Sequence, residues 1–94
     1  MDRKYKVLII YDVSDNKQRR NYVKILNRFG NRVQYSAFEA VLSEKHYKKL
    51  INKIGVIHRS DDCIRVYKMY MDTEISCFGD SDSLFIDLND DIII

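Results

Sequence analysis

One apolar run near the start of the sequence limits the folds that this chain can adopt. In an extended strand, residues 5–11 carry apolar side chains on both sides: Tyr5, Val7, Ile9 and Tyr11 on one, Leu8 and Ile10 on the other. Such a strand belongs in the middle of a sheet with both faces covered. Asp12 then puts a carboxylate where the strand leaves the core, the place where ligands collect in open α/β sheets. Asp12 is therefore a candidate functional residue, the alternative being a turn aspartate or a helix cap.

The length of the sequence predicts a single domain over residues 1–94, with a core that buries only roughly 60–65% of the unfolded surface. A symmetric dimer is a natural way for so small a chain to cover its strand edges. The apolar run Val7–Ile10 is too short for a signal peptide or a membrane span, so no membrane partner is expected. Cys63 and Cys77 have neither metal-site nor disulfide spacing, and we expect reduced, packed cysteines in a cytoplasmic protein.

The net charge of +2 hides an asymmetry between two parts of the chain. Residues 1–60 hold 14 Lys and Arg against 5 Asp and Glu, a net charge of +9, whereas residues 61–94 hold 2 against 9, a net charge of −7. The two parts either neutralise each other or leave the basic part able to bind a polyanion such as nucleic acid.

The first helix is predicted from about Asn16 to Phe29, with a left-handed residue at Gly30-Asn31 ending it. Its buried stripe has helical spacing and consists of Tyr22, Ile25, Leu26 and Phe29. Lys17, Arg19 and Arg20 lie in its first turns, where positive charge opposes the helix dipole. These cations either form a solvated basic face or bind an anion near the loop of Asp12.

The run from Arg32 to Leu42 alternates between an apolar and a mixed face. The expected core face consists of Val33, Tyr35, Ala37 and Val41, and the mixed face of Arg32, Gln34, Ser36 and Phe38. A face of this composition fits a subunit interface or a nucleic-acid groove. The run is either one strand or two short strands separated by a turn or bulge near Gln34 to Ser36.

The remaining elements complete an α+β sandwich with both helices on one face of the sheet. We expect a helix with Ser43 as its N-cap that ends at Ile54 before Gly55, a strand over Cys63–Met71, a short strand over Glu74–Phe78 and an edge strand over Ser83–Leu88. Asp80 and Asp82 are interpreted as turn residues, because the other ligands of a calcium loop are missing.

Several common chemistries find no support in the sequence. His46 and His58 are the only histidines, and no HExxH motif, Ser-His-Asp spacing or glycine-rich phosphate loop is present. Hydride transfer, P-loop hydrolysis and triad catalysis are therefore not predicted.

Taken together, several segments resemble the CRISPR-associated protein 2 family. They are Tyr11-Asp12-Val13, then Arg19-Arg20 at a helix start, then Gly30-Asn31-Arg32-Val33-Gln34-Tyr35-Ser36-Ala37-Phe38-Glu39, with a tail of Phe85-Ile86-Asp87-Leu88 and Ile92-Ile93-Ile94. The resemblance implies a ferredoxin-like β-α-β-β-α-β fold with an extra C-terminal edge strand. It also implies a homodimer in which the segment from about residue 79 to 94 packs on the partner subunit.

The function that the resemblance implies is that of a small Mg²⁺-dependent endonuclease acting on RNA or DNA, which joins the CRISPR-associated protein 1 integrase in acquiring spacer DNA. Asp12 matches the metal-binding and catalytic aspartate of the family, placed near its two-fold mate. By the same resemblance, the residues that meet nucleic acid are Tyr11, Arg19, Arg20, Arg32 and Phe38, with Phe38 alternatively packing at the interface. The chain departs from the family where Asn21 and Tyr22 follow Arg20, since members often carry a further basic residue there.

Two further functions stay open beside the nuclease. The first is a non-catalytic scaffold, a basic dimer that grips duplex DNA and bridges integrase subunits, favoured by the +9 segment and by Asp15 being the only other carboxylate close to Asp12. The second is a ferredoxin-like regulatory module that binds a small ligand or only itself. The nuclease requires two copies of Asp12, because one carboxylate is a poor Mg²⁺ site and two such charges brought together need a cation between them.

Overall fold

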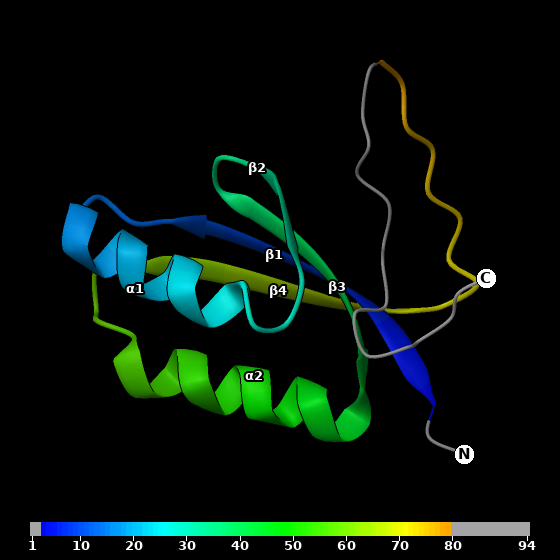
Figure 1. Cartoon of the computed structure of the whole chain (residues 1–94), viewed down its shortest axis with the longest axis horizontal. Coiled ribbons are helices and arrows are strands. Elements are labelled where there is room, and N and C mark those ends of the chain that lie inside the picture. Colours follow the sequence, from blue (N-terminus) through cyan, green and yellow to red (C-terminus); the bar gives the residue numbers. More distant parts are fainter. Residues whose placement is uncertain (1–2, 80–94) are drawn as a thin grey trace.

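The computed structural model describes residues 3–79, which form strands and helices in the order β-α-β-β-α-β. The elements are β1 (Lys4–Asp12), α1 (Asn16–Leu26), β2 (Asn31–Gln34), β3 (Ala37–Ser43), α2 (Glu44–Ile57) and β4 (Cys63–Tyr70). The strands make one antiparallel sheet in the order β2-β3-β1-β4, and the helices lie side by side along it (Figure 1). The predicted α+β class is confirmed.

Strand β1 is central, as its two apolar sides predict. It pairs with β3 from Lys4↔Ser43 to Ile10↔Ala37 and with β4 from Tyr5↔Tyr70 to Asp12↔Cys63. The two helices cover only one of its faces, the side of Val7, Ile9 and Tyr11. On the other side Leu8 is half-buried and Ile10 is 40% exposed, so the expectation of two covered faces fails at the end of the strand nearest Asp12.

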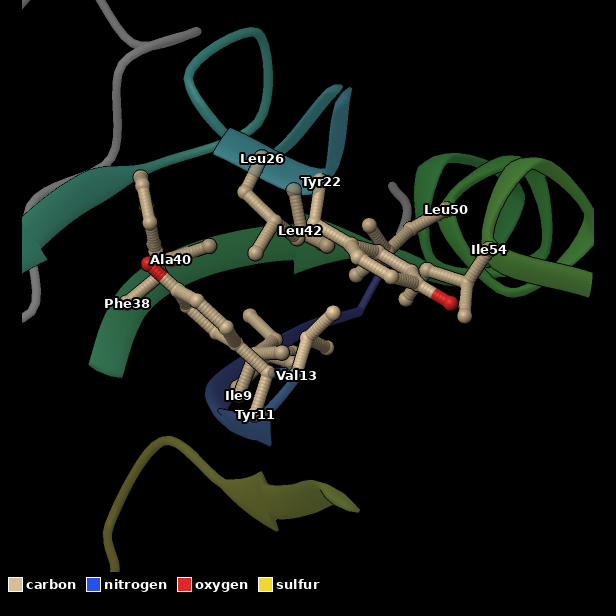
Figure 2. Close-up of a cluster of buried hydrophobic side chains, with 11 residues drawn as sticks. Ile9, Tyr11, Val13, Tyr22, Leu26, Phe38, Ala40, Leu42, Leu50 and Ile54 are labelled. Atoms are coloured by element: carbon tan, nitrogen blue, oxygen red, sulfur yellow. The ribbon is translucent and has the colours of Figure 1, made fainter. Parts of the chain in front are cut away.

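The hydrophobic core lies between this covered face and the helices. Figure 2 shows buried side chains from two strands and two helices pointing toward one another. The contributors are Ile9 and Tyr11 of β1, Val13 just after it, Phe38, Ala40 and Leu42 of β3, Tyr22 and Leu26 of α1, and Leu50 and Ile54 of α2. Helices with one apolar stripe each are sufficient to close such a two-layer core.

Helix α1 begins as an Asx-capped helix and ends without a left-handed residue. Asp15 is the N-cap, and its carboxylate accepts a hydrogen bond from the backbone N–H of Gln18 at 2.8 Å. After Leu26 the chain tightens into turns in which Phe29 N–H donates to Leu26 C=O, so the regular helix is shorter than the predicted span. Gly30 does not adopt a positive φ, so the proposed left-handed stop is wrong.

Helix α2 confirms the predicted cap and overruns the predicted end. The Ser43 hydroxyl accepts a hydrogen bond from the His46 N–H at 3.2 Å. The helix continues through Gly55 to Ile57, because an isolated glycine weakens a helix by only about 1 kcal/mol and does not break it.

The run from Arg32 to Leu42 is two strands, which confirms the split alternative. Of its predicted core face, Val41 is buried and Val33 half-buried as expected, but two aromatic positions are inverted. Tyr35, predicted to be buried, is 68% exposed, and Phe38, predicted on the mixed face, is fully buried. The turn at residues 35–36 and a register shift between Arg32 and Gln34 explain the inversion, since either one resets the alternation of sides.

Past β4 the chain leaves the sheet (yellow to orange trace, Figure 1). The predicted strand over Glu74–Phe78 is therefore wrong: residues 73–78 form no strand, and the pairing of β4 with β1 ends at Tyr70 opposite Tyr5. Cys63 and Cys77 are free and exposed, which contradicts their predicted packing. The predicted edge strand Ser83–Leu88, the turn residues Asp80 and Asp82 and nearly all of the segment 79–94 lie outside the described residues. No helix within residues 3–79 is long and apolar enough to cross a membrane.

Candidate metal and nucleic-acid site

Asp12 is the last residue of β1, and its side chain is exposed. Because alternate residues of a strand share a side, Asp12 lies on the same face as Leu8 and Ile10, the face that the helices leave open. Asp12 lines a cavity of about 370 Å³ together with Ile10, Tyr11, Val13, Arg19, Tyr35 and Ser36. The end of the central strand therefore carries an accessible acid with a guanidinium in the same hollow.

Arg19 is fixed in that hollow by the loop between β1 and α1. Its Nε donates to the carbonyl of Val13 at 3.1 Å and its guanidinium also to the carbonyl of Ser14 at 3.3 Å. The same group donates to Asn16 Oδ1 at 2.7 Å and to the Tyr35 hydroxyl at 3.1 Å. A positive charge in the first turn of α1 interacts unfavourably with the helix dipole. The hydrogen bonds from Arg19 to oxygens of the loop offset this interaction.

Arg20 and Arg32 line a second cavity of about 380 Å³ between α1 and β2, together with Asn16, Arg19, Val23, Lys24 and Tyr35. Arg32 donates two hydrogen bonds, from Nε and from its terminal nitrogen, to the carbonyl of Tyr35. Arg20 is exposed, and no hydrogen bond or ion pair with residues 3–79 occupies its side chain. The structure therefore brings all three predicted arginines to one side of Asp12.

The two predicted aromatic contacts are corrected by the structure. Phe38 is 0% exposed and Tyr11 only 2% exposed, so neither ring is accessible to a nucleic acid. The rings pack on each other with centroids 6.1 Å apart, and the Tyr11 hydroxyl donates to the carbonyl of Tyr35 at 2.8 Å. Both residues hold the turn beside Asp12 in place from beneath.

A polar network around Asp62, which sequence reasoning missed, fixes the start of α1. Asp62 Oδ2 accepts hydrogen bonds from the Tyr22 hydroxyl at 2.7 Å, from Gln18 Nε2 at 3.0 Å and from the backbone N–H of Arg59 at 3.0 Å. Gln18 Nε2 also donates to the carbonyl of Ile57 at 2.6 Å. Burial, and then the Asp62 carboxylate, raise the pKa of Tyr22, so its phenol stays a donor. The network joins α1 to the loop between α2 and β4.

The Asp62 network predicts an acid-sensitive contribution to stability. Desolvation raises the pKa of Asp62, but the hydrogen bonds from Gln18, Tyr22 and Arg59 outweigh it and hold the pKa below its ordinary value. A depressed pKa in the folded state stabilises the fold above the unfolded pKa of about 3.9, and this contribution is lost as pH falls through the folded pKa. In urea unfolding, Asp62→Asn should lower stability at neutral pH by about 1–3 kcal/mol, with the difference from wild type shrinking below about pH 4.

Asp61→Asn is the matched control for this measurement. Asp61 is the exposed neighbour of Asp62, and its substitution removes the same charge. A difference between wild type and Asp62→Asn that stayed constant down to the acid transition would contradict the role of the ionised carboxylate.

Among the described residues, the carboxylates of a single chain are too few at the end of β1 to surround a metal ion. Within residues 3–79 no three His, Cys, Asp or Glu side chains gather closely enough to hold a metal ion together. Asp15, the carboxylate next along the chain, is engaged as the cap of α1. One chain thus offers one accessible carboxylate at the end of β1.

Comparison with known proteins identifies the family. The model of the CRISPR associated protein Cas2 family matches residues 5–74, which is most of the chain and includes Asp12, Arg32 and Tyr35. The chain belongs to the Cas2 family. A CRISPR-associated endoribonuclease Cas2 of Mycobacterium tuberculosis (strain CDC 1551 / Oshkosh) is 44% identical over 73 residues, covering 78% of this chain and 65% of that protein. The chain therefore spans just under two thirds of the length of that Cas2 relative.

Solved structures share the fold of this chain. A hypothetical protein, TT1823, from Thermus thermophilus superposes with a TM-score of 0.75 at 25% identity, over 83% of this chain and 94% of that one. A chain of a partial Cas6-RT-Cas1–Cas2 complex superposes with a TM-score of 0.62 at 30% identity, over 72% of this chain and 81% of that one. The match of the family model over residues 5–74 and the 44% identical relative confirm the sequence-based resemblance to this family.

Proposed function

We propose that two copies of this chain form a cytoplasmic Mg²⁺-dependent endonuclease that cleaves phosphodiester bonds of RNA or DNA, and that the dimer assists spacer acquisition together with the Cas1 integrase. The observation that carries the proposal is the accessible Asp12 carboxylate at the end of the central strand, facing a hollow that also holds Arg19. The name of the M. tuberculosis relative, an endoribonuclease, and the Cas1–Cas2 complex among the similar structures support it.

The open face of the sheet supports the dimer. It exposes apolar side chains that no helix covers, among them Ile10 at 40% and Tyr67 at 42%, and Asp12 lies at the end of the same face. Burying two such faces against each other would remove apolar area from water and bring the two Asp12 side chains toward one interface. We propose a ferredoxin-like protomer in this dimer, with the segment from about residue 79 to 94 packing on the partner.

The residues present fit Mg²⁺ only in such a pair. Mg²⁺ prefers octahedral oxygen coordination, keeps several waters and is commonly bound through one or two carboxylates, which two copies of Asp12 would supply. When bound, Mg²⁺ lowers the pKa of a coordinated water and polarises a phosphate oxygen. The protein itself would bind the substrate backbone through Arg20 and Arg32, while Arg19 holds the loop of Asp12 in place.

The test is Mg²⁺-dependent cleavage of short single-stranded RNA and DNA by purified protein. Asp12→Asn keeps the shape of the side chain and removes its charge, and it should lower the cleavage rate at least a hundredfold, equivalent to about 2.7 kcal/mol. Asp15→Asn is the matched control: the same charge is removed three residues away, and asparagine caps a helix as well as aspartate. Cleavage that survives Asp12→Asn, or that EDTA fails to stop, would exclude this mechanism.

A second function, the non-catalytic scaffold that bridges integrase subunits on duplex DNA, is favoured by the charge of the outer face of α2. Lys45, Lys48, Lys49 and Lys53 of this helix are all exposed, and residues 1–60 carry a net charge of +9. The scaffold requires that Asp12→Asn spare spacer acquisition and leave duplex binding and its salt dependence unchanged. The same variant therefore separates the two functions.

A further inference from the structure

The most exposed aromatic side chain near Asp12 is one that sequence reasoning placed in the core. Tyr35 lies at the turn between β2 and β3, and it is 68% exposed. It lines both the cavity beside Asp12 and the cavity between α1 and β2. The ring therefore stands at the boundary between the acidic end of β1 and the basic groove of Arg20, Lys24 and Arg32.

The backbone of Tyr35 is held by hydrogen bonds from one buried side chain, Tyr11, and one exposed side chain, Arg32. Its carbonyl accepts a hydrogen bond from the Tyr11 hydroxyl at 2.8 Å and two more from Arg32. The neighbouring Ser36 carbonyl accepts from the Tyr11 N–H at 3.0 Å, which ties the turn to β1. A turn with this many partners presents its side chain in one orientation.

Two guanidinium groups hold the ring of Tyr35 itself. The Cζ of Arg19 lies 5.7 Å and that of Arg32 5.1 Å from the ring centroid, both within cation–π range. Arg19 also donates to the phenol oxygen at 3.1 Å. The ring is thus held among charges that attract phosphate, in a residue that is 68% exposed.

We propose that Tyr35 is a stacking platform for an unpaired nucleobase, which positions single-stranded RNA or DNA against Asp12. The proposal rests on the proposed nuclease function and adds to it the residue that binds the base. Every nucleobase has a face that stacks on an aromatic ring, and positive side chains beside the ring bind the flanking phosphates. Bases within a duplex are already stacked on their neighbours, so the platform selects single strands.

The first test is binding measured in the Asp12→Asn background, where the oligonucleotide stays intact. The probes are short oligothymidylate and oligouridylate, each compared with an abasic oligonucleotide of the same length, by fluorescence polarisation. Loss of one stacked base corresponds to about a tenfold loss of affinity, so Tyr35→Ala should weaken binding of both base-bearing probes about tenfold and leave the abasic probe unchanged. Tyr35→Phe should bind as wild type, because the ring is kept.

Tyr70→Ala is the matched control in this assay. Tyr70 is also an exposed tyrosine, at 61%, with the Cζ of Arg3 5.6 Å from its ring centroid. It pairs with Tyr5 at the opposite end of β1 from Asp12. Its loss should leave binding of the same probes unchanged.

The second test reads the stacking contact directly. The sequence contains no tryptophan, so Tyr35→Trp introduces the only indole of the protein at the proposed platform. Its fluorescence should be quenched on addition of oligothymidylate or oligouridylate and stay unchanged on addition of the abasic probe. Double-stranded DNA should likewise leave the fluorescence unchanged.

Three outcomes would overturn the platform. Equal loss of base-bearing and abasic binding in Tyr35→Ala would show that the ring only orders the arginines, and unchanged binding would show that bases do not reach it. Indole fluorescence of Tyr35→Trp that no base-bearing probe quenches would also show that bases do not reach this position. Each of these can occur while wild type still cleaves through Asp12, whereas a protein that binds no probe at all would remove the proposed function as well.

Discussion

Replacing Gly30 by alanine should unfold much of the protein at temperatures where wild type is fully folded. A Cβ at position 30 would lie 2.2 Å from the backbone oxygen of Glu39 and 2.7 Å from the Cβ of Ala40. Both atoms belong to β3, which is paired on each side within the sheet and cannot move without breaking hydrogen bonds to β1 or β2. Overpacking of this kind costs about 3 kcal/mol, a large part of the stability of a domain of this size.

The measurement is urea unfolding followed by far-UV circular dichroism at one fixed protein concentration, since association would add to the apparent stability. Gly55→Ala is the matched control: a Cβ there meets nothing within 4 Å, and alanine is the better helix residue by up to about 1 kcal/mol. The two glycine substitutions should therefore shift the unfolding midpoint in opposite directions. A Gly30→Ala midpoint equal to that of wild type would show that β3 yields to the added methyl group.

The glycine at position 30 also illustrates what the sequence alone could predict. A glycine after a helical stripe indicates the end of a helix, and α1 does end shortly before it. The reason for glycine is different, because the residue keeps a negative φ and instead makes room for the close passage of β3. Close approach of two segments nine residues apart depends on how they pack, which local spacing does not report.

The elements with strong periodicity were predicted correctly in type and place, although both helices end at other residues than expected. Strand β1 lies in the centre of the sheet, between β3 and β4, as its apolar run predicts, and Ser43 caps α2 as expected for a residue whose hydroxyl accepts an N–H bond. The position of Asp12 at the end of β1 followed from the same run. These features depend on interactions within a few residues of the chain.

The features that the sequence did not predict depend on long-range contacts or on the phase of a turn. Asp62 meets Tyr22 across 40 positions and Gln18 across 44, and no periodic pattern connects such residues. Tyr35 was assigned to the core because one uninterrupted alternation was continued through the turn at residues 35–36. A turn near Gln34 to Ser36, which the split alternative contains, resets the alternation and accounts for the buried side chain of Phe38.

The turn at residues 35–36 also places Phe38 in the core, where its substitution should cause a second large loss of stability. The ring is 0% exposed and packs against Tyr11, so Phe38→Ala should lower the free energy of unfolding by about 3–5 kcal/mol. Any loss of nucleic-acid binding or cleavage in this variant should follow from the smaller folded fraction. The check is to compare the unfolding midpoint with the activity across temperature, at fixed protein concentration.

The substitution Phe38→Leu distinguishes a role of Phe38 in core packing from a direct contact with a nucleobase. Leucine fills most of the space and should cost only about 1.5 kcal/mol or less, leaving the protein folded at low temperature. There it should bind single-stranded oligonucleotides within about twofold of wild type, whereas the removal of a ring that stacks on a base would weaken binding about tenfold. A tenfold loss in folded Phe38→Leu would mean that the β2–β3 turn opens in solution and exposes the ring. Unchanged binding beside a weakened Tyr35→Ala would assign base contact to the exposed tyrosine and support of the turn to the buried phenylalanine.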